Sequence, residues 1–277
     1  MNASPPSAAE ATASAWPSAP KAHALVRALL KQGQMDEARQ LLRQARQVGG
    51  QDPDLDDLHF LLHPGWKQPI GCAAGQLRLP TLGDAAFFKQ CFDDASFMHD
   101  FHRTARRYAE VSEIEKILSR QIATEVHQSA SLHWVLACPE GSTDRPSGLV
   151  SLANIHAAHR RAEFLIGVPQ GRSGLRSLAL IGALLAMDFA FNRVGLHKLT
   201  TIVFADNAHS QQSTLSLGFE QEGFRRQHMR DRRSGQWLDC FDNGMTAPAF
   251  RRNPRLSMLS LRLLGRDITL NPQQAAA

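Results

Sequence analysis

The pattern of apolar and polar positions divides the chain into a short helical part and a longer part of strands and helices. Residues 1–20 are rich in Ala, Ser and Pro and carry little apolar bulk, which is typical of a disordered tail. Between residues 22 and 45, apolar residues recur at helical spacing on both sides of Gly33, so two helices are predicted there. A third helix is predicted over residues 53–62, and Pro64-Gly65 marks a boundary.

Beyond that boundary, short apolar runs alternate with helical patterns. The predicted strands are residues 77–79, 132–138, 148–155, 164–168 and 199–204, with a last strand from Trp237. Thr81 and Asp84 resemble a capping box at a helix start, and residues 112–121 predict another helix. A polar loop at 140–146 predicts a hairpin. This order predicts an α/β (α+β) fold, in which helices cover a mixed sheet.

A glycine-containing turn follows the predicted strand at 164–168. Pro169, Gly171 and Gly174 form this turn, and an almost wholly apolar helix begins at Leu175. A helix that starts on such a turn presents unpaired N–H groups and the positive end of its dipole, which can hold a phosphate. A plain strand-to-helix connection has the same pattern, so the turn alone does not decide the function.

Several motifs then follow in a fixed order. They are Ala162-Glu163-Phe164, the turn at 170–174, Leu196-His197-Lys198, Asn207-x-x-Ser210, Leu217-Gly218-Phe219-x-x-Glu222-Gly223 and Trp237-x-Asp239. In this order they resemble the GCN5-related N-acetyltransferase (GNAT) family. The resemblance implies the GNAT fold over residues 67–247. The nearest branches are the ribosomal-protein, spermidine and amino-sugar-nucleotide acetyltransferases.

The flanking segments carry their own predictions. Residues 21–64 resemble a single tetratricopeptide-type helical hairpin, with Pro53 closing the unit. One hairpin cannot bury its apolar face alone, so it docks either on the acetyltransferase domain or on a protein partner, and both possibilities stay open. Residues 248–277 form a basic tail in which leucines and arginines alternate at helical spacing. We expect it to pack on its own domain rather than on a membrane.

The resemblance implies acetyl-CoA as co-substrate, held between the splayed strands 164–168 and 199–204. The cofactor-binding residues would be Ile166, Val168, Gly171, Arg172, Ser173, Gly174, Leu175 and Asn207. The turn departs from the family pattern Gln/Arg-x-x-Gly-x-Gly/Ala: with Gly174 as its glycine, Arg176 stands where a small residue belongs. A register one helical turn later puts Ala179 in the small position but Ser177 at the glycine. Arg176 would either clash with the cofactor or bind its phosphate.

The resemblance also implies direct attack of a primary amine on the thioester. Glu163 is the expected base, with a plain surface charge as its alternative role, and the N–H near Ile166 would hold the oxyanion. Thr214 stands where the family often has a tyrosine acid, so Ser210 is expected to protonate the thiolate. Asn207 and Ser210 would also cap a helix. His228 is either a second acid/base group or a surface residue.

A run of arginines in residues 225–233 bears on the acceptor. Arg225, Arg226 and His228 are the predicted substrate-binding residues, and the run would repel a polyamine and attract an anionic acceptor. We therefore expect a nucleotide-linked amino sugar or a protein N-terminus. The alternative is a non-catalytic CoA-binding or scaffold protein that acts through its helical hairpin.

Composition adds few constraints. The net charge is +5 and the four cysteines are scattered, which favours reduced thiols, a cytoplasmic protein and no metal site. No apolar run is long enough for a membrane span, and the N-terminus does not read as a signal peptide. We do not expect nucleic acid to be a partner, because no aromatic residues interleave the basic run. The oligomeric state is not predicted.

Overall fold

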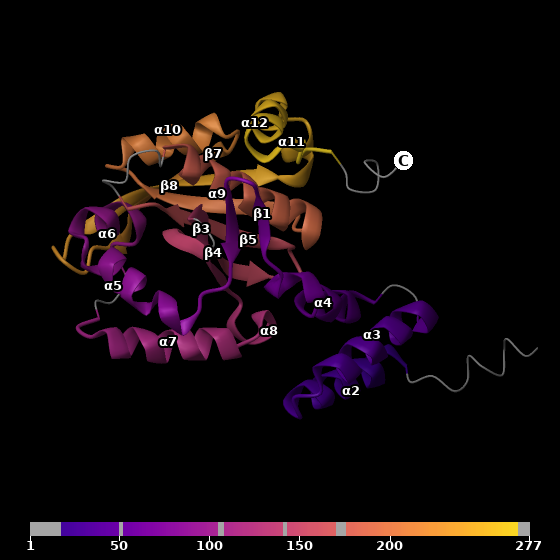
Figure 1. Ribbon diagram of the computed structural model, residues 1–277. Helices are drawn as coiled ribbons and strands as arrows, with labels where there is room; N and C mark the ends of the chain where they lie inside the picture. The colour runs from indigo at the N-terminus through magenta and orange to yellow at the C-terminus, as the bar shows by residue number, and fades with distance from the viewer. Residues whose placement is uncertain (1–17, 50–51, 105–107, 141–142, 170–175, 271–277) are drawn as a thin grey trace, which may run out of the picture. The chain divides into compact units, whose positions relative to one another are not determined.

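The computed structural model describes residues 18–49, 52–104, 108–140, 143–169 and 176–270 (Figure 1). The chain divides into two compact units, with the boundary between His63 and Pro64. Each unit is described by itself. The predicted disordered tail lies outside the described residues up to residue 17, and the first helix begins at Ala19.

The first unit consists of three helices, α2 (Ala19–Lys31), α3 (Met35–Gly49) and α4 (Pro53–Leu61). Gly33, with φ +75°, makes the turn between α2 and α3, a conformation that glycine adopts without steric cost. The buried core of the unit comprises Ala22, Val26, Ala38, Leu42, Ala45, Leu55, Leu58 and Leu62. Because α4 supplies Leu55 and Leu58, and Leu62 follows it directly, this third helix covers the apolar face of the predicted hairpin. The likeness to a tetratricopeptide stays a prediction.

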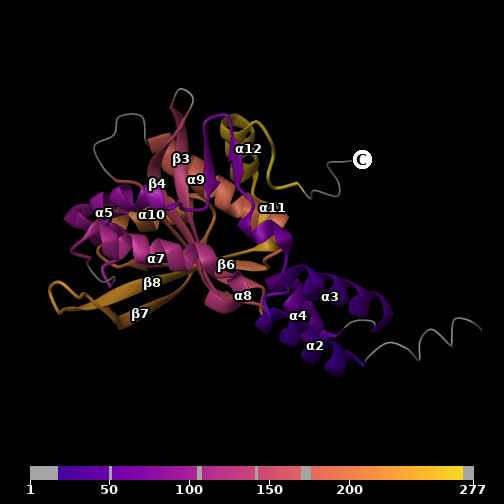
Figure 2. The same cartoon turned by 60° about the horizontal axis from the view of Figure 1, so that its bottom comes forward.

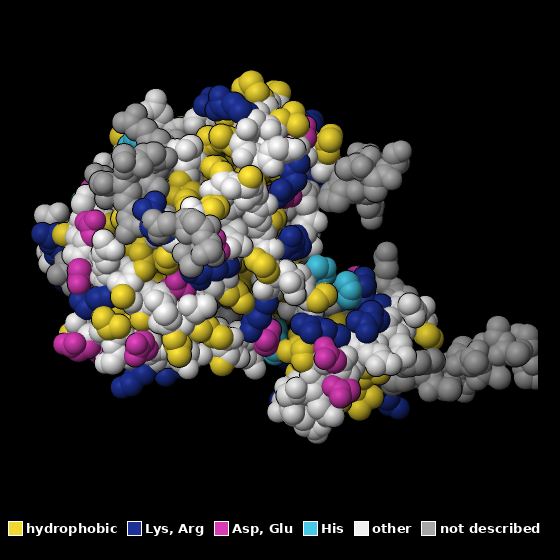
Figure 3. All heavy atoms as spheres, viewed as in Figure 1, with side chains coloured by type: hydrophobic (Ala, Val, Ile, Leu, Met, Phe, Trp, Pro, Cys, Tyr) yellow, Lys and Arg dark blue, Asp and Glu magenta, His cyan; other side chains and the backbone are white. Residues whose placement is uncertain are grey.

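Polar contacts cap α4 and hold it against α3. The carboxylate of Asp52 caps α4 by accepting from the backbone N–H of Leu55 at 3.0 Å. Arg46 Nε donates to Asp56 at 2.8 Å, and Arg39 Nε donates to the carbonyl of Leu62 at 2.9 Å. Figure 3 shows Lys/Arg, Asp/Glu and His side chains among hydrophobic ones on the visible surface of this unit.

The second unit is built on one eight-stranded sheet, with strand order β1-β2-β3-β4-β5-β6-β8-β7 (Figure 2). The strands are β1 (Ile70–Cys72), β2 (Gly75–Arg78), β3 (Leu132–Glu140), β4 (Thr143–His156), β5 (Arg161–Gly167), β6 (Lys198–Phe204), β7 (Glu220–Arg230) and β8 (Trp237–Thr246). Only β5 and β6 pair in parallel; the other neighbouring strands of the described sheet are antiparallel. The predicted mixed sheet and its strands are confirmed, and β1 was not predicted.

Helices cover both faces of the sheet. On one face, here called the α7 face, lie α5 (Ala85–Asp93), α6 (Ala95–Phe101) and α7 (Val111–Ala123), which pack on Val135 and Leu149. On the other, the α9 face, lies α9 (Arg176–Asp188), which continues as a π-helical turn (Phe189–Arg193). A Cβ built on Gly182 of α9 would lie 3.0 Å from Ile166 Cδ1 and 2.8 Å from Leu136, so these two side chains point to the α9 face.

Short helices complete the second unit. They are the 3-10 turns η1 (Pro64–Lys67) and η2 (Leu82–Asp84), and the α-helices α8 (Val126–Ser129), α10 (Ala208–Ser216), α11 (Ala247–Arg251) and α12 (Pro254–Leu264). The predicted capping box at Thr81 and Asp84 is present. In the described part of the chain, no helix has both the length and the apolar character needed to cross a bilayer.

Helix α12 confirms the helix predicted in the basic tail. Leu256, Leu259 and Leu264 are buried, and the helix packs against α9. Arg266, just beyond it, donates to Asp188 of α9 at 2.9 Å. The described part of the tail, residues 248–270, therefore lies on its own domain, because its leucine stripe completes the layer over the α9 face.

Candidate active site

The two parallel strands β5 and β6 pair only at their beginnings. Arg161, Ala162 and Glu163 oppose Lys198, Leu199 and Thr200, and beyond them the described residues 164–167 and 201–204 do not pair with each other. Both segments stay paired on their outer sides, with β4 and β8. The predicted splay is therefore present. It leaves two facing backbone edges to which an extended chain with amide groups can hydrogen-bond, so the strands fit the pantetheine arm of acetyl-CoA.

Glu163 is the last paired residue of β5, at the closed end of this gap. Its side chain points to the α7 face, since Ile166 points to the α9 face and successive strand residues alternate. One carboxylate oxygen accepts from the Nδ2 of Asn154 at 2.8 Å. Asn154 lies at an irregularity of β4 with φ +51°, a conformation that Asn tolerates better than most residues. A carboxylate held at the gap by an amide can accept a proton from an approaching amine.

Asn207 and Ser210 lie at the open end of the gap. The side chain of Asn207 is the N-cap of α10 and accepts from the backbone N–H of Ser210 at 3.0 Å. The predicted capping role of Asn207 is therefore confirmed. β6 runs four residues beyond Thr200 to Phe204, so its unpaired part is about 13 Å long. Glu163 lies at the closed end of the gap, and α10 with Ser210 follows its open end. Thr214 lies one turn further along α10 and is partly exposed.

Helix α10 is fixed to the sheet by a pair of amide side chains that the sequence reasoning missed. Gln211 Nε2 donates to Asn243 Oδ1 at 2.9 Å, and Asn243 Nδ2 donates back to Gln211 Oε1 at 3.0 Å. Both residues are buried, so the two bonds satisfy groups that would otherwise be unpaired. The pair fixes the helix that carries Ser210 and Thr214.

The predicted substrate-binding residues lie on the hairpin of β7 and β8. Arg225 Nε donates to Asp242 at 3.0 Å, and Arg225 Nη1 lies 3.2 Å from His228 Nε2. Arg225, Arg226 and His228 are all exposed. Further along, Arg230 Nε donates to the carbonyl of Gly235 at 3.1 Å. The charge of Arg225 is thus compensated within the protein, which the sequence pattern did not indicate.

A second polar pair lies on the α7 face beside the gap. His133 Nδ1 and the hydroxyl of Ser151 are 2.8 Å apart, and Ser151 opposes Leu165 of β5. Burial lowers the pKa of His133, and the charge of His102 lowers it further, so the ring is neutral near pH 7. Sequence reasoning missed this pair, although a histidine within the apolar run 132–138 was a signal that it needed a partner.

The predicted phosphate turn, residues Gly171, Arg172, Ser173, Gly174 and Leu175, lies outside the described residues, as does the side chain of Arg176. Helix α9 begins at Arg176, directly after this segment. Val168 follows the last residue of β5 and is partly exposed. The phosphate-binding role of the turn therefore stays a prediction.

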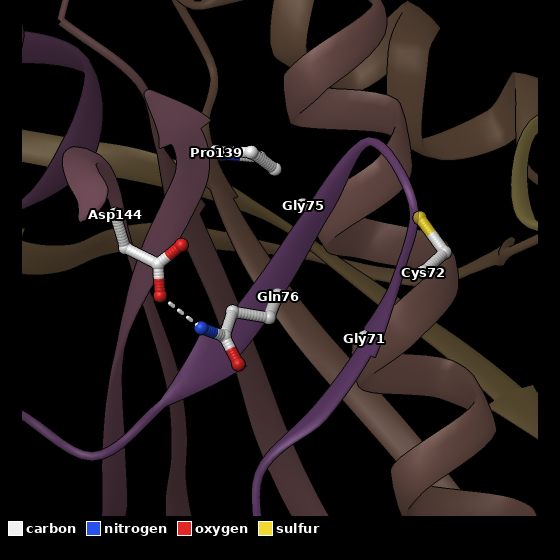
Figure 4. Close-up of a pocket in the computed structure, with 6 residues that line it drawn as sticks. All are labelled: Gly71, Cys72, Gly75, Gln76, Pro139 and Asp144. Carbon is white, nitrogen blue, oxygen red and sulfur yellow. Dashed lines mark hydrogen bonds between the residues drawn. The ribbon is translucent and has the colours of Figure 1, made fainter. Parts of the chain in front are cut away.

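A pocket of about 380 Å³ lies elsewhere on the sheet, between the β1–β2 hairpin and the β3–β4 hairpin (Figure 4). It is lined by Gly71, Cys72, Gly75, Gln76, Pro139 and Asp144. Gln76 Nε2 donates to Asp144 across it. Strand β5 lies between these elements and the gap, so this pocket is not part of the gap. Among the described residues, no group of three or more His, Cys, Asp or Glu side chains is placed to hold a metal ion.

Comparison with known proteins identifies the class to which this site belongs. Residues 76–220 match the family model described as the acetyltransferase (GNAT) domain. The chain belongs to this family and is an N-acetyltransferase, for which acetyl-CoA is the co-substrate. It is 30% identical to the spermidine N(1)-acetyltransferase of Escherichia coli K12 over 141 residues, which cover 50% of this chain and 69% of the relative.

Two solved structures have the same fold. Mycobacterium smegmatis RimJ in complex with CoA-disulfide superposes with a TM-score of 0.61 at 22% identity, over 74% of this chain and 98% of that chain. Spermidine N-acetyltransferase from Vibrio cholerae in complex with CoA and spermine gives 0.51 at 24% identity, over 61% and 94%. At this identity the likeness concerns the fold alone.

Proposed function

We propose that the enzyme acetylates the N-terminal amine of a protein. The observation that carries this choice is the exposure of Arg225, Arg226 and His228, the candidate residues for acceptor binding. A small ligand is usually enclosed by its site, whereas a protein acceptor brings its own bulk to cover an open surface. Exposed side chains on a sheet edge suit the second kind of acceptor.

The register of the sheet supports an extended acceptor. Glu163 on β5 and Arg225 on β7 are three strand spacings apart across the sheet, about 14 Å. They are also four residues apart along it, about 13 Å, because Glu163 aligns with Thr200 whereas Arg225 aligns through Cys240 with Phe204, so the two positions lie about 19 Å apart. An extended peptide advances about 3.3 Å per residue, so about six residues cover this distance. An N-terminal segment can therefore place its amine at Glu163 and its following residues along the hairpin.

Charge pairing makes a polyamine a poorer acceptor. On β7 and β8, Glu222 accepts from Lys198 Nζ at 2.7 and 2.6 Å, and Asp242 is paired with Arg225. These carboxylates are already compensated, so a polycation finds few free negative groups. Acidic residues near the acceptor N-terminus would instead face the exposed arginines of the hairpin.

The residues around the gap have separate roles in binding acetyl-CoA and in proton transfer. Acetyl-CoA supplies the acetyl group, and the edges 164–167 and 201–204, with Val168, Asn207 and the turn 171–175, would hold it. Glu163 accepts a proton from the amine, directly or through water, because the protonated α-amino group, with an ordinary pKa of about 7.7 to 8.0, is no nucleophile. The N–H of Ile166 donates to the carbonyl oxygen that gains charge. The Ser210 hydroxyl donates a proton to the leaving thiolate.

The test measures thiol release from acetyl-CoA with a panel of amines. The panel contains peptides with a free N-terminus and acidic following residues, the same peptides with a blocked N-terminus and a free lysine, spermidine, and a nucleotide-linked amino sugar. We expect turnover with the free N-terminus and little with the others. Preferred turnover of spermidine or of the amino sugar would contradict the proposal.

Two variants test the assigned roles. Glu163→Gln is expected to lower kcat about 100-fold, and Ser210→Ala about tenfold, both with unchanged affinity for coenzyme A. Asp93→Asn, an exposed change on α5, is the matched control and leaves kcat unchanged. If Glu163→Gln turns over like the control, Glu163 is not the base.

A further inference from the structure

Helix α6 lies against the end of β5 on the α7 face. Phe97 and Phe101 of this helix stack on each other with ring centroids 5.0 Å apart. A Cβ built on Gly167, the last residue of β5, would lie 2.5 Å from Phe101 Cδ2 and 2.8 Å from Phe97 Cε2. The two rings therefore rest directly on the β5 backbone, at a point where glycine leaves room for them.

The segment at the C-terminal end of α6 is also bound to the end of β6. Arg103 follows the helix, and its side chain is 3% exposed. Its two terminal nitrogens each donate to an oxygen of Asp206 at 2.7 Å. The guanidinium also lies 4.5 Å above the ring centre of Phe204, the last residue of β6, and Arg103 Nε donates to the carbonyl of His99.

A second contact joins the same two segments. Asn207 Nδ2, next in sequence to Asp206, donates to Asp100 Oδ1 of α6 at 3.3 Å. Asp206 and Asn207 form the connection between β6 and α10, so α6 contacts the ends of both diverging strands. It spans the open end of the gap on the α7 face.

Neighbouring strands of a sheet close on each other unless something prevents it, because closure pairs backbone groups that otherwise lack partners. The guanidinium of Arg103 is buried, although the side chain of Asp206 is 57% exposed. Removing the carboxylate would leave this buried charge uncompensated, so the pair resists separation. We propose that α6 and the Arg103–Asp206 pair hold β5 and β6 apart, which makes Arg103 and Asp206 positioning residues for coenzyme A. This inference rests on the gap being the acetyl-CoA site.

Loss of the pair is expected to let the strands close part of the time. The apparent affinity of a ligand falls by the fraction of molecules that remain competent to bind it, so closure in nine of ten molecules weakens binding about tenfold. Calorimetric titration with coenzyme A measures this affinity without any knowledge of the acceptor. Asp206→Asn is the main variant. Arg103→Lys, which keeps the charge but not the bidentate geometry, should retain part of the affinity.

The chain offers a control in a second bidentate Arg–Asp pair, in which Asp84 is more deeply buried than Asp206. Arg78 donates to both oxygens of Asp84 at 2.8 Å in the same unit, on strand β2 and away from the gap. Asp84→Asn should lower the melting temperature at least as much as Asp206→Asn, yet leave the dissociation constant of coenzyme A within about twofold of the wild type.

The outcomes separate the inference from the proposed function. Weaker binding in Asp206→Asn, partial recovery in Arg103→Lys and no change in Asp84→Asn support the inference. Wild-type affinity in folded Asp206→Asn and Arg103→Lys, or equal weakening in Asp84→Asn, overturns it. If Asp206→Asn does not fold, Arg103→Lys against Asp84→Asn decides. If peptides with a free N-terminus are not acetylated, the proposed acceptor is wrong, but the coenzyme A binding results still test the present inference.

Discussion

The carboxylate of Asp84 is the best-defined stability contribution in the acetyltransferase unit. It is 3% exposed and accepts two hydrogen bonds from Arg78 at 2.8 Å, one from the backbone N–H of Thr81 at 2.7 Å and one from the Thr81 hydroxyl at 3.0 Å. Asp84→Asn keeps the shape of the side chain but removes the charge that these donors compensate. The Arg78 guanidinium then lies mostly buried beside a neutral amide.

The magnitude follows from this geometry. Breaking a buried ion pair by removing one partner costs about 3 to 5 kcal/mol, and the partial exposure of Arg78 favours the lower figure of about 3 kcal/mol. In a unit of this size, that lowers the melting temperature by about 6 to 12 °C. The assay compares the melting temperatures of Asp84→Asn and Asp93→Asn. Asp93 is the control because it pairs with Lys89 at an exposed position within α5. Equal shifts in the two variants would refute the reasoning.

The pH dependence of the stability provides a second measurement of the Asp84 contribution. Burial raises the pKa of Asp84, but the hydrogen bonds from Arg78 and Thr81 together lower it more, so the folded-state pKa lies below the ordinary value. The contribution is present above the unfolded pKa of about 3.9 and is lost as the pH falls through the folded pKa. The stability difference between wild type and Asp84→Asn should therefore shrink below about pH 4. A constant difference would contradict the assignment.

Three further changes have defined outcomes. Asn207→Ala removes the N-cap of α10 and should lower the free energy of unfolding by about 1 kcal/mol in a denaturant titration. Gly218→Ala should cost about 2 kcal/mol or more in the same titration, because Gly218 has φ +93° and a Cβ there would lie 2.0 Å from Asn253 Nδ2. Hydrogen bonding from Arg103 lowers the pKa of Asp206, so this pair stabilises above about pH 3.9 and is lost as the pH falls through the folded pKa. Arg103→Met should remove that part of the acid sensitivity, as measured by unfolding at pH 7 and pH 3.

Hydrophobic spacing predicted most of the fold because most elements bury one face. The strand at 132–138 and the helix at 112–121 correspond to β3 and α7, with ends shifted by one or two residues. Strand β1 was missed because it has three residues, one of them Gly71, too few to show an alternating pattern. The third N-terminal helix was predicted, but its role in covering the hairpin was not, since helical spacing does not say which helix a face meets.

The resemblance to the GNAT family, which the order of motifs carries, implied where the gap lies, and local pattern placed the two strands that border it. Glu163 was placed at the gap in this way, and the pairing of β5 with β6 agrees. The same reasoning treated Arg225 as an uncompensated charge. Its partner Asp242 lies across the hairpin, and only the register of β7 against β8 brings the two together.

The hydrophobic pattern could not predict contacts between residues that are far apart in the sequence. Helical and strand periodicities describe residues within one element, and turns describe the next one, so they inform on contacts between near neighbours in the chain. Arg103 and Asp206 are 103 residues apart and stand in segments with no periodic relation to each other. Before folding, Arg103 is one basic residue in a polar stretch and Asp206 one acidic residue before a helix cap. The position of the gap could therefore be expected from the family resemblance, whereas the contacts that we propose keep it open depend on where α6 packs on the sheet.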